Sequence, residues 1–67
     1  MKANAVGKRI NELRKAKNMT QEELALEANI DRSYIGRLIT KNMNCTVKNL
    51  EKICDALGVT MAQFFDC

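Results

Sequence analysis

The sequence predicts an all-α fold, a five-helix bundle that forms one domain over residues 1–67. Apolar residues recur at helical spacing, helix-capping residues precede most of these segments, and no segment alternates as a strand does. The chain contains no Pro and only three Gly, as expected for packed helices. Its length lies near the lower limit for one stable core, so we expect association with a partner to help.

The first helix is predicted over about residues 4–17, because Val6, Ile10 and Leu13 recur at i, i+4 and i+7. The second begins after Thr20, which forms a capping-box pattern with Glu23. It is expected to run from Gln21 to Ala28.

Asn29 tolerates the left-handed conformation that ends a helix, and Asp31 is a strong N-cap. A three-residue turn and a third helix over about residues 32–40 follow, with Ile35 and Leu38 on its apolar face. The unit at 21–41 thus has the spacing of a helix-turn-helix.

Thr46 and Gly58 bound a fourth predicted helix, and Thr60 with Gln63 repeats the capping box before a short fifth helix that ends at Phe64-Phe65. The fourth helix is expected to bury one face formed by Val47, Leu50, Cys54 and Leu57.

Composition excludes several classes of protein. No stretch approaches the roughly 20 apolar residues of a membrane span, and Met1 leads into no apolar signal segment, so we expect a cytoplasmic protein. With no His and three cysteines without Cys-x-x-Cys spacing, we expect no metal, and Cys54 is interpreted as a core residue. No paired-carboxylate or Gly-rich phosphate motif is present, so we predict no enzyme, no cofactor and no small-molecule substrate.

Charge is unevenly distributed along the chain. Residues 1–19 hold six bases and one acid, residues 20–31 hold four acids and no base, and residues 32–48 hold four bases and no acid. Two basic blocks favour a surface that faces a polyanion, although charge runs are often only solvated faces.

The outward half of the third helix carries Arg32, Ser33 and Arg37, which are predicted to contact DNA bases, and Lys41, which is predicted to contact a phosphate. Arginine can donate two hydrogen bonds to guanine in the major groove. Gly36 lies on the same face, either to let the backbone approach DNA or as a tolerated surface glycine. Tyr34 lies at its edge, where an aromatic is commonly half-buried, but its place in the first turn favours DNA contact.

Further DNA contacts are expected from residues that flank this helix. Gln21 lies at the start of the second helix, where free amides favour a phosphate. The polar connection and the start of the fourth helix would offer more phosphate contacts, through Asn42, Asn44, Thr46 and Lys48.

A single helix-turn-helix reads only a few base pairs, so dimerisation is expected. Met61, Phe64 and Phe65 exceed what one side of a short terminal helix can bury, and they are predicted to form a two-fold contact. Alternatively, the Phe pair closes the core.

These residues resemble the Cro/phage-repressor (XRE-like) helix-turn-helix family over about residues 7–65. The matching motifs are Arg-Ile-x-x-Leu-Arg at 9–14, Met-Thr-Gln-Glu-Glu-Leu-Ala at 19–25, Asp-Arg-Ser-Tyr-Ile at 31–35 and Leu-Glu-Lys-Ile-Cys-Asp-Ala-Leu-Gly-Val-Thr at 50–60. The Asn-Ile-Asp-Arg-Ser-Tyr-Ile stretch looks like restriction–modification controller proteins.

The resemblance implies a lambda-repressor-like DNA-binding domain, with Gln21 on a phosphate and with Arg32, Ser33, Tyr34 and Arg37 reading or packing against bases. The chain departs from the family after the third helix, where an acidic residue usually pairs with the equivalent of Arg14. Arg14 is therefore expected to face phosphate or solvent.

The sequence thus predicts a homodimeric regulator of transcription that binds a palindromic operator in double-stranded DNA. The competing hypothesis is an antitoxin-like module that uses the same fold to bind another protein. Affinity for duplex DNA distinguishes them.

Overall fold

The computed structural model describes residues 5–41 and 43–66 and contains five helices, α1 (Ala5–Ala16), α2 (Gln21–Ala28), α3 (Arg32–Lys41), α4 (Val47–Leu57) and α5 (Met61–Phe65). No strand occurs within these residues. The all-α prediction is confirmed, and α3 extends one residue beyond its expected end, to Lys41.

The predicted N-caps are present. Thr20 Oγ1 accepts a hydrogen bond from the Glu23 amide at 3.0 Å, and the Thr20 amide donates to Glu23 Oε1 at 2.8 Å. Thr60 and Gln63 form the same reciprocal pair at the start of α5. Thr46 Oγ1 accepts from the Asn49 amide at 3.1 Å. These bonds satisfy amides that have no partner within the first helical turn, and they fix where each helix begins.

The helix ends depend on left-handed residues. Asn29 has φ +55° and Gly58 has φ +72°, as predicted. Asn18 has φ +57° and ends the first helix in the same way, an ending that the sequence analysis did not identify.

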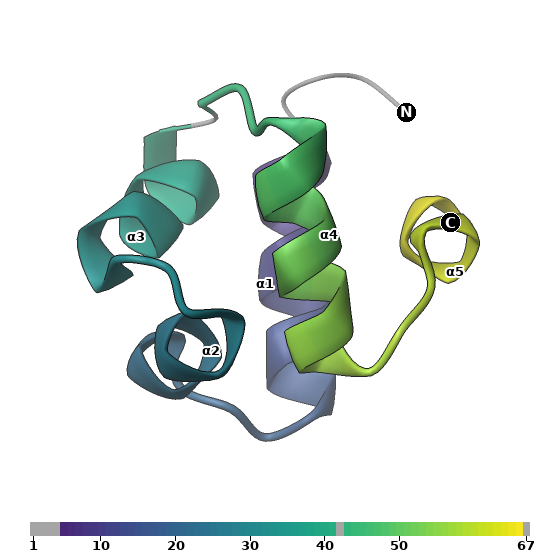
Figure 1. Cartoon of the computed structure of the whole chain (residues 1–67), viewed down its shortest axis with the longest axis horizontal. Helices are drawn as coiled ribbons and strands as arrows, with labels where there is room; N and C mark the ends of the chain where they lie inside the picture. Colours follow the sequence, from purple (N-terminus) through teal and green to yellow (C-terminus); the bar gives the residue numbers. More distant parts are fainter. Residues whose placement is uncertain (1–4, 42, 67) are drawn as a thin grey trace.

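The helices are arranged around α1 and α4, which contact each other. Figure 1 shows α2 and α3 on one side of this pair and α5 on the opposite side. The helix-turn-helix unit and the C-terminal helix therefore occupy different faces of the molecule.

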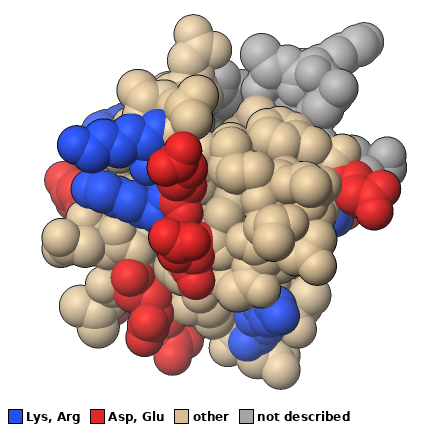
Figure 2. Space-filling model, turned by 45° about the vertical axis from the view of Figure 1, so that its right-hand side comes forward, with Lys and Arg blue, Asp and Glu red and all other residues tan. Residues whose placement is uncertain are grey.

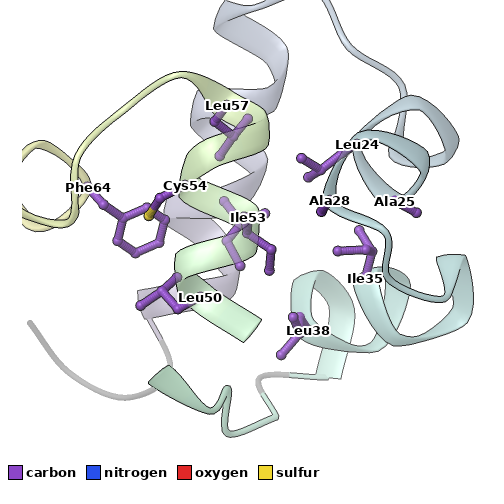
Figure 3. Packing of buried hydrophobic residues seen from close by; sticks show 11 residues of the cluster. Leu24, Ala25, Ala28, Ile35, Leu38, Leu50, Ile53, Cys54, Leu57 and Phe64 are labelled. Atoms are coloured by element: carbon purple, nitrogen blue, oxygen red, sulfur yellow. The ribbon is translucent and has the colours of Figure 1, made fainter. Parts of the chain in front are cut away.

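The core joins all five helices. In Figure 3, Leu24 and Ala28 of α2 and Ile35 of α3 face α4, while Phe64 of α5 lies beside Cys54. The fully or nearly fully buried residues are Ile10, Leu24, Ala25, Ala28, Ile35, Leu38, Leu50, Ile53, Cys54, Leu57 and Phe64. Cys54 is thus a core residue, as interpreted from its spacing, and its burial raises the pKa of its thiol.

Val47 is an exception to the predicted apolar face of α4. Its side chain is 65% exposed, because it occupies the first position of the helix, directly after the Thr46 cap. The expectation that Val47 is buried is therefore wrong.

Gly7 lies where α1 packs closely on the backbone of α3. A Cβ atom built at Gly7 would lie 1.9 Å from the carbonyl oxygen of Leu38, far inside van der Waals contact. The residue is buried, and only glycine permits the two backbones to pack at this distance.

Arg9 of α1 joins two parts of the chain that are distant in sequence. Arg9 Nε donates to the Phe64 carbonyl at 2.7 Å, and its Nη2 donates to the carbonyls of Gln63 and Asp66 at 3.0 and 3.2 Å. The guanidinium thereby satisfies carbonyls at the C-terminal end of α5.

Arg14 holds the turn between α1 and α2. Its Nη1 donates to the Met19 carbonyl at 2.6 Å, and its Nη2 donates to Asn11 Oδ1 at 2.6 Å. The expectation that Arg14 faces phosphate or solvent is wrong, since a backbone carbonyl and an amide oxygen replace the acidic partner that the family usually provides.

Candidate nucleic-acid interface

The outer face of α3 is held in place by the buried inner face. Ile35 and Leu38 have no exposed surface, whereas Arg32, Ser33, Arg37 and Lys41 are all exposed. The helix contains three cations and no acid. A rigid helix therefore presents a basic polar surface to solvent, in the arrangement that the sequence predicted.

Asp31 caps the start of this helix. Its Oδ1 accepts a hydrogen bond from the Ser33 amide at 3.1 Å. Hydrogen bonds from the Ser33 backbone and side chain, together with the positive charge of Arg37, hold the pKa of Asp31 below its ordinary value. The carboxylate stays ionised and orients the first turn of α3.

Two further contacts order the exposed face. Arg37 Nη1 lies 3.5 Å from Ser33 Oγ, one turn earlier. Thr40 Oγ1 donates to the Gly36 carbonyl at 2.7 Å, so its hydroxyl is used within the helix. Ser33 and Arg37 thus form one adjacent pair of hydrogen-bonding groups.

Arg32 contacts the preceding helix. Its Nε lies 3.4 Å from Glu22 Oε1, and both side chains are mostly exposed, at 63% and 74%. Within residues 5–41 and 43–66 this is the single ion pair. Arg32 is among the residues predicted from the sequence to contact DNA, whereas Glu22 is not, although Glu22 belongs to the acidic block at residues 20–31.

Tyr34 is half-buried and packs against the core. A hydrogen bond with the Tyr34 side chain lowers the pKa of Cys45, although burial has the larger effect and raises the pKa of that thiol. The Tyr34 side chain thus reaches the connection between α3 and α4. Of the two interpretations offered by the sequence, a half-buried aromatic residue is the one that matches the position of its ring.

Gln21 lies over the middle of α3. Its Oε1 would be 3.6 Å from a Cβ atom built at Gly36, which is ordinary contact distance. The space at Gly36 therefore accepts a methyl group, and packing within the subunit does not require glycine there. Close approach to DNA remains a hypothesis for this residue.

The flanking residues lie at the end of α3, in the connection that follows it and at the start of α4. Lys41 ends α3, and Asn44 and Lys48 are exposed. Thr46 is exposed too, but its Oγ1 already accepts the capping bond of α4. Asn42 lies outside the described residues.

The predicted dimer residues separate into two groups. Phe64 has no exposed surface, so its ring closes the core of its own subunit and the prediction of an intersubunit contact is wrong for it. Phe65 is 43% exposed and packs against the Phe64 ring edge-on, with centroids 5.0 Å apart. Met61 is half-buried, with Sδ 3.7 Å from Cys54 Sγ.

On the side of the molecule where α5 lies, Figure 2 shows a broad surface without basic or acidic side chains, bordered by a column of acidic groups. Met61 and Phe65 belong to α5 itself. This uncharged face is separate from the basic face of α3.

None of the helices in the described part of the chain is long and apolar enough to cross a membrane. The same residues contain no group of three or more possible metal-binding side chains.

The sequence and the fold are both similar to those of known controller proteins. The control protein C.BamHI of Bacillus amyloliquefaciens is 38% identical over 61 residues, which cover 90% of this chain and 75% of that protein. The controller protein C.AhdI of Aeromonas hydrophila superposes with a TM-score of 0.87 at 35% identity, covering 94% of this chain and 96% of that chain.

The controller protein C.Esp1396I, in a structure bound to a 25 base pair operator site, superposes with a TM-score of 0.90 at 39% identity. The match covers 96% of this chain and 84% of that chain. The predicted resemblance to restriction–modification controllers is confirmed. The helix-turn-helix family model matches residues 10–64, and the chain therefore belongs to the helix-turn-helix family.

Proposed function

We propose that this chain is a DNA-binding regulator of transcription that recognises a palindromic operator as a homodimer. The observation that carries the proposal is the exposed basic face of α3, which is held rigid by the buried side chains of Ile35 and Leu38. The similar controller protein bound to an operator site provides independent support.

The chemistry of the α3 face suits the major groove. Arg32 and Arg37 have the planar donor set that pairs with guanine O6 and N7, and Ser33 can contact several base edges. Lys41 lies at the end of the helix, where a cation would meet the phosphate backbone. Gln21 lies at the start of α2, where free amides add to phosphate binding.

Dimerisation would place two such helices on successive half-sites. Phe65 and Met61 belong to α5, which lies on the opposite side of α1 and α4 from α3 (Figure 1), and Phe65 is 43% exposed. A two-fold contact there leaves both reading helices free for DNA. As a regulator of transcription the protein would work in the compartment that holds its target DNA, which we propose to be the cytoplasm, and we assign it no catalytic reaction and no cofactor.

The proposal is tested by selecting duplexes from a randomised library with the purified protein. We expect an enriched palindrome that binds with an affinity that falls steeply as salt rises, because phosphate neutralisation releases counterions. If no duplex is enriched above background, the DNA-binding proposal fails and a protein-binding role of the same fold takes its place.

Two substitutions separate base reading from phosphate binding. Arg37→Ala should weaken binding to the selected palindrome by about 1–3 kcal/mol and relax the preference at one base position. Lys41→Ala should weaken binding to all duplexes alike and reduce the salt slope by about one. Titrations against the palindrome and a scrambled duplex measure both effects. Equal loss on the two duplexes for Arg37→Ala would exclude a base contact.

A further inference from the structure

The Arg32–Glu22 ion pair places an acid beside the first cation of the reading helix. Glu22 lies in the first turn of α2, and its carboxylate comes within 3.4 Å of Arg32 Nε. The two residues border a hollow of about 510 Å³ that is also lined by Leu26 and Ile30. The pair is open to solvent, so a phosphate approaching α3 can reach the same guanidinium.

Stability does not account for this pair. Exposed ion pairs contribute little to folding, because water screens the attraction and both side chains lose rotamer freedom. An acid at this position also repels DNA, since every phosphate that nears Arg32 nears Glu22 as well. The position of Glu22 should therefore lower the affinity for any duplex.

We infer that Glu22 is a specificity-determining residue, which restrains Arg32 from binding phosphates indiscriminately and orients its guanidinium toward a base edge. This inference rests on the proposed DNA-binding function. On a non-specific duplex, repulsion between Glu22 and phosphate opposes binding with no compensation. On the operator, the guanidinium reaches its base already oriented, and the lower ordering cost offsets the repulsion.

Glu22→Gln is the informative substitution, and Glu27→Gln is its matched control. Glu27 is an exposed acid on the same helix and does not contact Arg32 in the structure. Both variants remove one negative charge from α2. A difference between them reflects either the contact with Arg32 or the place of Glu22 in the first turn of α2, where an acid also favours the helix dipole; the Arg32→Ala background separates the two.

The experiment measures affinity for the selected palindrome and for a scrambled duplex of equal length, across a series of salt concentrations. We expect Glu22→Gln to lower the ratio of specific to non-specific affinity by roughly fivefold and to steepen the salt slope on the scrambled duplex by about one, because Arg32 then binds a phosphate. Glu27→Gln should change the ratio by less than about twofold. Equal changes in the two variants would overturn the inference.

A double variant distinguishes positioning from loss of helix stability. In an Arg32→Ala background, Glu22→Gln should change the affinity ratio no more than Glu27→Gln does, since there is no guanidinium left to restrain. If the extra effect persists without Arg32, Glu22 acts through the fold and the inference is wrong. Binding of wild-type protein to the palindrome is measured first, so failure of the proposed function is seen separately.

Discussion

Gly7 shows how a single residue sets the distance between two helices. Its missing side chain allows α1 to pack directly on the Leu38 carbonyl of α3. Gly36, on the exposed face of α3, has room for a methyl group. Both glycines lower the intrinsic stability of their helices. They differ in packing, because a methyl group would clash at Gly7 and would fit at Gly36.

Replacing each of these glycines with alanine should give changes in stability of opposite sign. Gly7→Ala should lower the free energy of unfolding by about 1–3 kcal/mol or more, because the new methyl group forces α1 away from α3. Gly36→Ala should raise it by up to about 1 kcal/mol through helix propensity. Urea denaturation of both variants measures this. A stable Gly36→Ala protein with weakened operator binding would support close approach of the backbone to DNA.

Residues whose partners are near in sequence could be predicted, and those with distant partners could not. The Thr20–Glu23 pair spans three residues, so its pattern is visible in the sequence. Arg9 contacts Phe64, which is 55 residues away, and Gly7 packs on Leu38. Nothing local distinguishes Arg9 from the exposed lysine beside it, because its role depends on where α5 lies.

Among the elements, α3 begins with a cap whose strength depends on pH. The pKa of Asp31 is lowered in the folded protein, chiefly by the Ser33 amide hydrogen bond. A depressed carboxyl pKa stabilises the fold above the unfolded-state value of about 3.9, and that contribution is lost as pH falls through the folded pKa. The start of the reading helix should therefore weaken in acid.

Asp31→Asn tests this dependence. At neutral pH the variant should be less stable than the wild type, because the amide accepts the capping bond without a charge to favour the helix dipole. The difference should begin to shrink below about pH 4, where Asp31 of the unfolded chain takes up a proton, and should disappear as pH falls through the lowered pKa of Asp31 in the folded protein. Urea midpoints for both proteins at several pH values measure it. A difference that does not change with pH would show that the charge has no role in the cap.

The helix α5 is too short to be stable alone, since it has only five residues. It is attached by the buried Phe64 ring, by the contact of Met61 with Cys54 and by the three carbonyls that accept hydrogen bonds from Arg9. The sequence correctly predicted where α5 begins, from Thr60 and Gln63. It did not show which Phe faces inward, because adjacent residues in one helical turn have similar apolar character.

Arg9→Met should release the end of α5 and lower the free energy of unfolding by about 1.5–3 kcal/mol, since hydrogen bonds from a charged donor are lost. Amides in residues 61–66 should exchange with solvent faster than in the wild type, while those of α2 and α3 keep their protection. Lys8→Met removes a neighbouring exposed charge and serves as the control. Uniform loss of protection along the chain would contradict a local anchor.

In the molecule as a whole, α3, which we propose to face DNA, and α5, which we propose to face a second subunit, lie on opposite sides of α1 and α4 (Figure 1). Phe65 is the large apolar side chain exposed on the α5 side, and Leu26 is 81% exposed on α2. The general architecture followed from periodicity and caps. The separation of the two faces could not be predicted from the sequence, because it depends on how α5 folds back over α4.

Phe65→Glu should weaken self-association by roughly tenfold or more, because each subunit would place a charge in an apolar contact. Leu26→Glu makes the same change on α2 and should leave the dimer intact. Sedimentation equilibrium of both variants measures this, with operator affinity of Phe65→Glu expected to fall in parallel. A monomeric Leu26→Glu protein with dimeric Phe65→Glu would assign the interface to α2.

The bridge between Arg9 and the end of α5 also has a kinetic consequence. Its partners are 54–57 residues apart, so closing it costs more chain entropy than joining α2 to α3 across a three-residue turn. During folding we expect the DNA-reading unit to mature first and the surface for self-association to mature last. A newly made subunit would then acquire its reading helix before it can recruit a second copy.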